Sequence, residues 1–410
     1  MRNETAGALW KPRREAAILH PLTMGEVPVD FEFTSEQKVL RDTVRSFAEK
    51  KIRPNVRTWD AAGTFPREIF AELGEMGILG VIFPETYGGA AMSYVDYVII
   101  VEELSRVDPS VGIGVAAHNS LCSNHIFSMG TEEQRQRFLT PLASGKKIGA
   151  WALTEPGSGS DAAGLRTTAA RKDGGWILNG TKTFCTHATV GDTAVIIALT
   201  DKADPHHGCT AFVVEKGTPG FKHGKKEDKL GLRASDTGEL IFEDCLLSED
   251  NRLGEVGHGF TDALKILDGG RISIAALSLG GAQGAYETAL QYAKQRVAFG
   301  KKIAEFQAIQ FALADMATRI QAARLLTFQA ALRKDKGLPV TKFSAMAKLY
   351  ASEVSVWAAE RAVQILGGYG FVKDYPAEKF YRDVKLNTIG EGTSEIQRLV
   401  IARHVLKDFE

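Results

Sequence analysis

The feature that most constrains this chain is the order in which its hydrophobic periodicity changes. Apolar residues recur at helical spacing from Thr34 to about residue 148. Short β-rich runs separated by Gly, Asp and Pro turns follow from Trp151, and helical spacing returns at about Gly259. Because a parallel sheet would need alternating βαβ units, this segregated order favours separate α and β layers. The order predicts an α+β protein.

The same pattern divides the chain into four segments. We expect an extended N-terminal tail over 1–33, an all-α domain over 34–150, a middle antiparallel β-domain over 151–258 and a C-terminal four-helix bundle over 259–410. The longest helices are predicted near 260–297, 304–336 and 341–366, with a break after the second at Gly337-Leu338-Pro339. A chain of 410 residues is long enough for two or three domains with cores of their own.

Charge and cysteine content narrow the function classes. Lys plus Arg and Asp plus Glu are both 50, so no excess positive charge favours nucleic acid or an anionic membrane. The four cysteines lack metal-ligand spacing, which predicts no metal site and a reducing compartment. No stretch approaches the roughly 20 apolar residues of a membrane span, and the first 30 residues lack a signal h-region. We expect a cytoplasmic protein.

A lone carboxylate stands between two glycines near the C-terminus, in Gly390-Glu391-Gly392. A catalytic base must reach contact distance of its substrate, and glycine neighbours remove the side chains that would block it. Thr393, the next residue, is predicted to cap the last helix. Taken alone, the segment fits an ordinary solvated loop better than a catalytic site.

Three further segments have residue types that suit a ring-shaped, phosphate-bearing cofactor. The run from Trp151 to Asp161 combines an aromatic residue, hydroxyls and glycines, although a β-turn would have the same composition. Asn179-Gly180 predicts a hairpin turn into a strand that presents Phe184 and Thr186 on one face. Arg296 to Gly300 places a cation and an aromatic ring at a helix end, which a solvated helix terminus would also explain.

A nicotinamide-binding fold is not indicated. No GxGxxG motif lies between a strand and a helix, as a Rossmann unit requires. The glycine-rich stretch from Gly280 to Gly284 lies within an Ala-rich helical segment, where small residues favour close helix packing. The run from Gly367 to Gly370 lacks the Lys-Ser/Thr pair of a P-loop.

Together, in this order and over this length, these segments resemble the acyl-CoA dehydrogenase family, most closely its short-chain or butyryl-CoA branch. The resemblance extends from about Phe33 to Phe409. It includes further runs in the middle and C-terminal parts of the chain: Leu230-Gly231-Leu232-Arg233, Leu253-Gly254-Glu255, Gln364 to Gly368 and Tyr381-Arg382-Asp383.

The resemblance implies an FAD-dependent flavoprotein oxidoreductase of fatty acid β-oxidation, usually a homotetramer, that converts an acyl-CoA substrate to its trans-2-enoyl-CoA and passes electrons to an electron-transferring flavoprotein. It implies that Glu391 removes the α-proton while the β-hydrogen leaves as hydride to flavin N5. The implied cofactor-binding residues are Trp151, Leu153, Thr154, Gly159, Ser160, Phe184, Thr186, Arg296, Phe299, Gln307, Gln364, Gly368, Thr393 and Glu395. Those from Arg296 to Gly368 would reach the FAD of a neighbouring subunit. The implied substrate-binding residues are Ser160, Asp268, Arg271 and Gly392.

Two positions depart from the family pattern. Phe184 stands where Trp is common, which keeps an aromatic face but removes an N–H donor. Gly390 stands where Tyr is common, and the extra room beside the thioester predicts a pocket that admits a bulkier or branched acyl group, while the resemblance to the short-chain branch implies a short-chain substrate. Some relatives carry the base on the helix near Arg271, but the residue before it here is Gly270, so Glu391 has no rival there.

Three alternatives stay open. A decarboxylating glutaryl-CoA-type enzyme needs a cation for the distal carboxylate, and no Lys or Arg lies between Pro109 and Ile126, where only His118 and His125 could serve. An acyl-CoA oxidase would reduce oxygen directly. A non-catalytic flavoprotein scaffold could keep the fold without the reaction.

Overall fold

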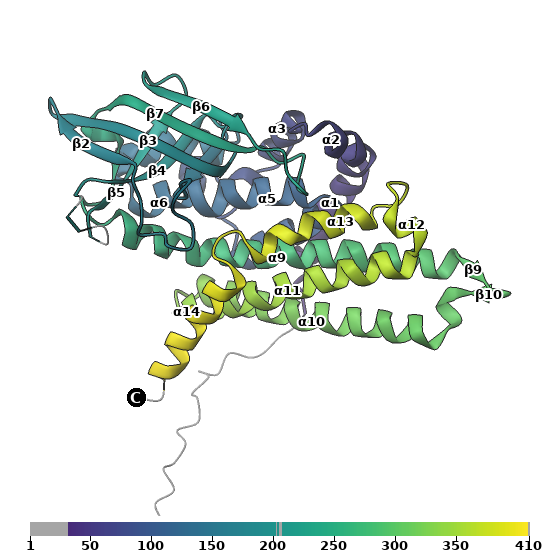
Figure 1. The fold of residues 1–410 in the computed structure, drawn as a ribbon. Helices are drawn as coiled ribbons and strands as arrows, with labels where there is room; N and C mark the ends of the chain where they lie inside the picture. Colours follow the sequence, from purple (N-terminus) through teal and green to yellow (C-terminus); the bar gives the residue numbers. More distant parts are fainter. Residues whose placement is uncertain (1–31, 202, 205–206, 409–410) are drawn as a thin grey trace, which may run out of the picture.

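The computed structural model describes residues 32–201, 203–204 and 207–408, and the predicted order of helices, strands and helices is confirmed. Figure 1 shows the sheet lying over one end of three long helices, with the N-terminal helices beside it. The tail expected over 1–33 falls, except for its last two residues, outside the described residues. The domain boundaries at 34, 151 and 259 stay a prediction.

The N-terminal helices begin and end where the sequence supplies local signals. Thr34 and Ser93 each form a capping box, with Gln37 and Asp96 respectively. Asp108 separates two helices, and its side chain accepts a hydrogen bond from the backbone N–H of Ser110. The helices are α1 (Ser35–Phe47), α2 (Val56–Ala62), α3 (Arg67–Glu75), α4 (Tyr94–Val107), α5 (Pro109–Ala117), α6 (Asn124–Met129), α7 (Glu132–Gln134) and α8 (Thr140–Ala143).

The middle of the chain forms a sheet that is eight-stranded in its described part, with the order β6-β7-β3-β2-β4-β5-β8 and β1 beside β4. Its strands are β1 (Gly149–Ala152), β2 (Thr168–Lys172), β3 (Gly175–Thr186), β4 (Thr193–Leu199), β5 (Cys209–Glu215), β6 (Phe221–Lys226), β7 (Thr237–Leu247) and β8 (Arg252–Leu253). Most pairs are antiparallel, but β1 and β2 both pair with β4 in parallel. The expectation of an antiparallel domain is therefore wrong for these pairs. Parallel partners need a crossover connection, and the strands that lie between them in the sequence provide it.

The hairpin turn predicted at Asn179-Gly180 is wrong, because β3 runs straight through both residues. Gly180 has a φ of 146°, and the pairing of β3 with β7 shifts register there, so the dipeptide marks a β-bulge. Asn179 instead exchanges two hydrogen bonds with Asp244 on β7, at 3.1 and 2.8 Å. The turn into β3 lies earlier, where Asp173 and Gly174 both have positive φ.

The C-terminal part consists of three long helices and shorter elements. These are α9 (Gly259–Gln295), β9 (Val297–Ala298), β10 (Lys301–Lys302), α10 (Gln307–Asp335), α11 (Thr341–Leu366), α12 (Gly368–Phe371), α13 (Ala377–Asp383) and α14 (Ser394–Lys407). Helix α9 packs against α4 as well as α10 and α11, and a Cβ at Gly280 or Gly284 would collide with the backbone of α4. The predicted packing role of these glycines is confirmed. None of the helices described here is long and apolar enough to cross a membrane.

The segment that follows α9 differs from the expected helix end. Arg296 caps the helix, and the chain then forms the two-stranded hairpin of β9 and β10, which projects from the far end of the bundle (Figure 1). Phe299 lies at the tip with a φ of 50° and with 95% of its surface exposed. The helical pattern could not reveal a hairpin of two residues per strand.

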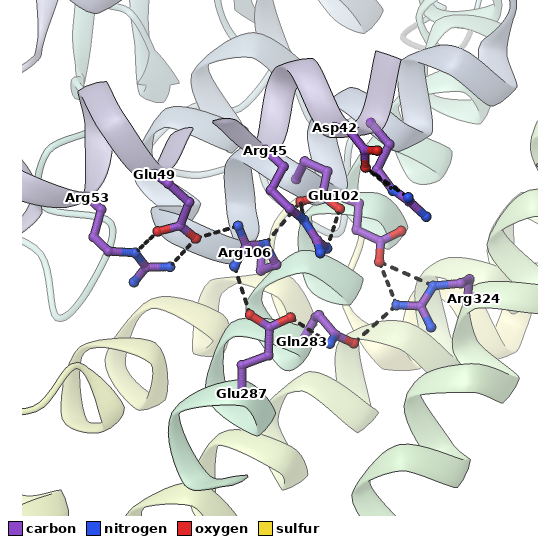
Figure 2. Close-up of polar contacts among 11 residues, drawn as sticks. Asp42, Arg45, Glu49, Arg53, Glu102, Arg106, Gln283, Glu287 and Arg324 are labelled. Atoms are coloured by element: carbon purple, nitrogen blue, oxygen red, sulfur yellow. Dashed lines mark hydrogen bonds and ion pairs between the residues drawn. The ribbon is translucent and has the colours of Figure 1, made fainter. Parts of the chain in front are cut away.

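Charged side chains join the N-terminal helices to α9 and α10. We call them the charge network: Arg45, Glu49, Arg53, Glu102, Glu103, Arg106, Gln283, Glu287 and Arg324 (Figure 2). Arg106, 4% exposed, lies at its centre and donates to Glu49 at 2.6 Å, Glu103 at 3.0 Å and Glu287 at 2.8 Å. Glu49 lies in the helical turn Ala48–Ile52 that follows α1, so the three bonds join this turn, α4 and α9 without leaving the arginine unpaired.

Candidate active site

Glu391 lies in a tight turn immediately before α14. The predicted cap is confirmed, because the side chain of Thr393 accepts a hydrogen bond from the backbone N–H of Ile396 at 3.3 Å. Both Glu391 and Gly392 adopt the left-handed conformation, with φ of 53° and 89°. A glutamate with positive φ is uncommon, and such residues cluster at functional sites because the surroundings must hold them there.

The carboxylate of Glu391 packs directly against the backbone of α9. A Cβ at Gly270 would overlap Oε2 of Glu391 and would lie 2.9 Å from Cδ2 of Leu121. Oε2 is fully buried and has no hydrogen-bond partner among the described residues. Gly270 therefore leaves room for a carboxylate oxygen that no protein donor satisfies.

This environment changes the proton affinity of the carboxylate. Burial raises the pKa of Glu391 to about 7, and the nearby cations Lys348 and Arg271 offset part of that rise. A carboxyl group with such a pKa can take up a proton near neutral pH, as a general base must.

Asp268 and Arg271, the predicted substrate-binding residues on α9, pair with each other. Nη1 of Arg271 donates to Asp268 at 2.6 Å, and the hydroxyl of Thr341 on α11 donates to the other carboxylate oxygen at 2.6 Å. Nε of Arg271 is buried and has no hydrogen-bond partner within residues 32–201, 203–204 and 207–408. The pair holds Arg271 close enough to Glu391 to affect its charge, and leaves one guanidinium N–H unused.

Two residues that the sequence did not indicate hold the turn itself. Nζ of Lys348, on α11, donates to the carbonyl oxygen of Gly392 at 2.6 Å. The side-chain amide of Gln397 donates to the same oxygen at 2.9 Å and to the carbonyl of Glu391 at 3.1 Å. A signal for Lys348 exists in hindsight, because it is the only charged residue among the buried positions of α11.

The segment that begins with Trp151 is anchored by a buried ion pair. Lys182 of β3 donates to Glu155 at 2.7 Å and to the carbonyl of Leu153 at 3.0 Å, and both charged side chains are at most 5% exposed. Thr154 accepts from the backbone N–H of Thr183 at 2.9 Å. Lys182 and Glu155 thus fix the loop with the predicted cofactor-binding residues to β3. The sequence did not indicate this role.

The exposed positions of this region leave room for a ligand. Phe184 is 66% exposed with a φ of 56°, and Thr186 on the same side of β3 is half-buried, while Cys185 between them is buried. Gly159 and Ser160 are exposed, and a Cβ at Gly159 would meet no other atom. An open aromatic face beside hydroxyls and uncrowded glycine backbone fits the ring and phosphates of FAD.

The Trp151 segment and the Glu391 site lie near each other. Trp151 packs on the small cluster formed by Ala117, Leu121 and Ile266, and Leu121 also lies against Gly270. The indole Nε1 of Trp151 donates to Nδ1 of His125 at 3.0 Å. The structure thus brings the predicted ring-binding segment and the predicted base together within one chain.

The remaining predicted cofactor residues lie elsewhere. Arg296, Phe299, Gln307, Gln364 and Gly368 are all exposed and gather at the end of the bundle where the β9–β10 hairpin projects (Figure 1). Because α9 rises about 1.5 Å per residue, Arg296 is about 39 Å along the helix from Gly270. At that separation, Arg296 cannot contact a small group that lies beside Glu391 of the same chain. Glu395, at the start of α14, is exposed next to Thr393.

The histidines considered for a distal carboxylate are engaged in packing. His118 is fully buried, contacts the carbonyl of Leu142 at 3.2 Å and accepts from the backbone N–H of Gly149 at 3.0 Å. Burial lowers the pKa of His118 to about 3 and that of His125 to about 4, so both are neutral. Among the described residues, no group of three or more His, Cys, Asp or Glu side chains could hold a metal ion.

Comparison with known proteins identifies the family to which this architecture belongs. Family models described as acyl-CoA dehydrogenase N-terminal, middle and C-terminal domain match residues 34–146, 150–245 and 257–406. A short-chain specific acyl-CoA dehydrogenase from Clostridium acetobutylicum is 45% identical over 379 residues, 92% of this chain and 100% of that protein.

Two solved structures have the same fold. Butyryl-CoA dehydrogenase from Megasphaera elsdenii matches with a TM-score of 0.91 and 45% identity, over 92% of this chain and 100% of that one. A chain in a structure described as "Electron transferring flavoprotein of Acidaminococcus fermentans: Towards a mechanism of flavin-based electron bifurcation" matches with a TM-score of 0.91 and 47% identity, over 92% and 99%. The resemblance inferred from the motifs and the expected fold class are confirmed: the chain belongs to the acyl-CoA dehydrogenase family.

Proposed function

We propose that this chain oxidises a short-chain acyl-CoA, straight or branched, to its trans-2-enoyl-CoA, with FAD as cofactor and Glu391 as the catalytic base. The observation that carries the proposal is the state of the Glu391 carboxylate. Its Oε2 is buried without a hydrogen-bond partner in the described part of the chain, and burial raises the pKa of the carboxyl group to about 7. Such a group is costly to keep unless it serves a reaction.

The residues around Glu391 suit removal of a weakly acidic α-proton. A thioester α-proton does not transfer to a carboxylate in water, so the site must exclude water and polarise the carbonyl. Packing against Gly270 and Leu121 excludes water from one side of Glu391. In the family, the backbone N–H of the base residue polarises the thioester carbonyl, and we assign that role to Glu391, with Gly392 and the Asp268–Arg271 pair contacting the substrate.

We assign the cofactor to the open face beside Trp151, Phe184 and Thr186. When bound, FAD would supply the hydride acceptor that no side chain of the protein can replace. Leu153, Thr154, Gly159, Ser160, Thr393 and Glu395 would complete the contacts from the same chain. Support comes from the uncrowded glycine backbone and from the anchoring of this loop by Lys182.

A neighbouring subunit would supply the remaining contacts. We propose a homotetramer in which Arg296, Phe299, Gln307, Gln364 and Gly368 reach the FAD of another copy. Their exposure in one chain and their distance from Glu391 support this arrangement. We further propose an electron-transferring flavoprotein as electron acceptor and a cytoplasmic location, the latter supported by the burial of all four cysteine thiols.

The acyl pocket is the least constrained part of the proposal. The relatives above are named for short-chain and butyryl-CoA substrates. A Cβ at Gly390 would meet its nearest neighbours on Leu386 only at 3.7 Å, so the backbone leaves space beside the base. That space supports acceptance of a branched acyl group.

The direct test removes the carboxylate charge without changing its shape. Purified Glu391→Gln should bind FAD and butyryl-CoA yet fail to bleach the flavin absorbance anaerobically, a loss of about 10²-fold to 10⁴-fold in rate. Glu360→Gln is the matched control, since the side chain of Glu360 on α11 is partly exposed and pairs with its neighbour Arg361. Normal bleaching in Glu391→Gln would place the base elsewhere, and a colourless wild-type preparation that cannot be reconstituted would exclude FAD.

A substrate screen separates the alternatives that the sequence left open. Anaerobic bleaching should be fastest with short straight or branched acyl-CoA. Reaction with glutaryl-CoA alone, accompanied by release of carbon dioxide, would indicate the decarboxylating enzyme, and rapid oxygen consumption would indicate an oxidase. Failure of every acyl-CoA to bleach a flavin-loaded protein would indicate the non-catalytic scaffold.

A further inference from the structure

Lys348 is an unusual residue for its position. It lies on the face of α11 that is lined with small side chains such as Ser344, Ala351 and Ser355, and it is itself 0% exposed. No carboxylate oxygen among the described residues lies within 4.0 Å of its Nζ, and its one hydrogen bond goes to the Gly392 carbonyl at 2.6 Å. A buried ammonium without an ion-pair partner lowers stability, so an apolar residue would serve packing better.

The carbonyl that Lys348 contacts belongs to the turn of the base. Gly392 follows Glu391 directly, and both residues have positive φ. Gln397, on α14, approaches the same carbonyl from the other side at 2.9 Å. Two donors therefore converge on one oxygen, which fixes the backbone that aims Glu391 at Gly270.

The charged and titratable groups that face Lys348 and Glu391 come from four elements. Arg271 lies on α9, where it is paired with Asp268, and Glu353 lies on α11 with Lys348. Glu395 lies on α14, and the phenol of Tyr97, which is neutral, lies on α4. Asp268 offsets the charge of Arg271 at 2.6 Å, whereas Lys348 has no such partner. Lys348 therefore contributes the less screened positive charge near Glu391.

Proton affinities agree with this geometry. Burial lowers the pKa of Lys348 to about 8, and the negative charge of Glu391 opposes that fall. Lys348 in turn has a larger effect than Arg271 in holding the pKa of Glu391 down against burial. Each group favours the charged form of the other.

We infer that Lys348 is a positioning residue for the reaction: it fixes the Glu391–Gly392 turn through the Gly392 carbonyl and, by its charge, keeps the base ionised. The inference rests on the proposed role of Glu391. It assigns two separable effects to one side chain, a geometric effect shared with Gln397 and an electrostatic effect that Gln397 lacks.

The experiment compares two substitutions of similar shape. Lys348→Met removes the charge and one donor, and Gln397→Met removes the other donor but no charge. Anaerobic stopped-flow reduction of the FAD-loaded protein by saturating butyryl-CoA is measured from pH 6 to 10. The Lys348 cation favours the ionised form of Glu391, so Lys348→Met should raise the pH midpoint of the rate profile by about one pH unit. The rate at pH 7 should then fall up to about tenfold, and the rate near pH 9.5 should equal that of the wild type.

The control should behave differently. Gln397→Met should lower the rate by a similar factor at every pH with an unchanged midpoint. FAD content and the thermal unfolding midpoint identify variants that fail to fold. If Lys348→Met fails to fold, Lys348→Arg, which keeps the charge, provides the test, because the pH midpoint of its rate profile should equal that of the wild type. A Lys348→Met profile that falls uniformly, or an unshifted midpoint in it, would overturn the inference. Glu391→Gln measured in parallel separates the cases: if it still reduces flavin, the proposed base fails as well.

Discussion

Two regions of this molecule hold carboxylates between helices, and they treat them in opposite ways. In the charge network, Arg53 and Arg106 both donate to Glu49, whose side chain is 37% exposed, and the hydrogen bond from Arg53 is the main cause that lowers the pKa of Glu49 to about 2 (Figure 2). At the candidate active site, no donor among the described residues reaches Oε2 of Glu391, and burial raises the pKa of that carboxyl to about 7.

The comparison separates the effect of a nearby positive charge on a carboxylate from the effect of a direct hydrogen bond. Lys348 and Arg271 lie near enough to Glu391 to affect its charge but make no hydrogen bond to it, whereas the network arginines contact their carboxylates directly. A carboxylate that accepts two charge-assisted bonds stays ionised and holds helices together. One that is only surrounded by charge can still accept a proton.

The largest expected effect comes from breaking the network at its centre. Arg106→Met leaves three carboxylates without their shared donor, and removing one partner of a buried pair costs about 3 to 5 kcal/mol. Denaturant unfolding at fixed protein concentration should show this loss. Arg41→Met, which breaks the exposed pair with Asp42, should cost no more than about 1 kcal/mol. Equal losses in the two variants would mean that the network is no more cooperative than a surface pair.

The next effect falls on activity and comes from filling the space beside the base. Gly270→Ala should displace the Glu391 carboxylate, and a displacement of about 1 Å can lower the flavin-reduction rate about 100-fold. Gly269→Ala is the neighbouring control, because the nearest atom to its Cβ would be Oη of Tyr94 at 3.3 Å. Stopped-flow reduction measures both. A Gly270→Ala enzyme with a near-normal rate would show that Glu391 does not depend on that contact.

Stability should respond with opposite sign when each carboxylate is made neutral. The raised pKa of Glu391 means that burying its charge costs stability as pH rises from about 4.5 through about 7, so Glu391→Gln should raise the thermal midpoint at pH 8 but not at pH 4.5. The lowered pKa of Glu49 contributes stability that is present above about pH 4.5 and lost as pH falls through about 2. Glu49→Gln should therefore lower the midpoint at pH 8. Shifts of the same sign would erase the contrast between the two regions.

The smallest expected effect concerns the two helix caps. Thr34→Ala and Thr393→Ala each remove a side-chain cap and should each cost about 1 kcal/mol in unfolding experiments. Only Thr393→Ala should also slow flavin reduction, since Thr393 begins the helix beside the base. If both variants slow the reaction equally, the cap at Thr393 has no special connection to the site.

Local signals in the sequence predicted the parts of the fold that neighbouring residues decide. The order of elements and the cap at Thr393 are confirmed, and α11 occupies the predicted range. These features depend on hydrogen bonds within one turn and on periodicity. The segments proposed for the site were also named from local composition, although their roles stay predictions.

Features that depend on partners distant in sequence could not be predicted. The parallel pairing of β1 with β4 and the bulge at Gly180 are set by neighbouring strands, so an Asn-Gly pair that usually turns a hairpin lies within β3. Lys348 is 44 residues from the carbonyl it contacts, and no spacing rule connects them. The role of Lys182 could not be predicted either, because the bulge between Lys182 and Cys185 changes how side chains alternate between the two faces of β3.

The contact between Gly270 and Glu391 also has an evolutionary meaning. A Cβ at Gly270 would lie 2.1 Å from Oε2 of Glu391, so a helix side chain and the Glu391 carboxylate would occupy the same space. A side chain at either position would fill it, so a base supplied from the helix and a base supplied from the turn are mutually exclusive occupants of the same space. A lineage could move its base from one position to the other only through changes at both residues, with the acid group and the glycine exchanging places.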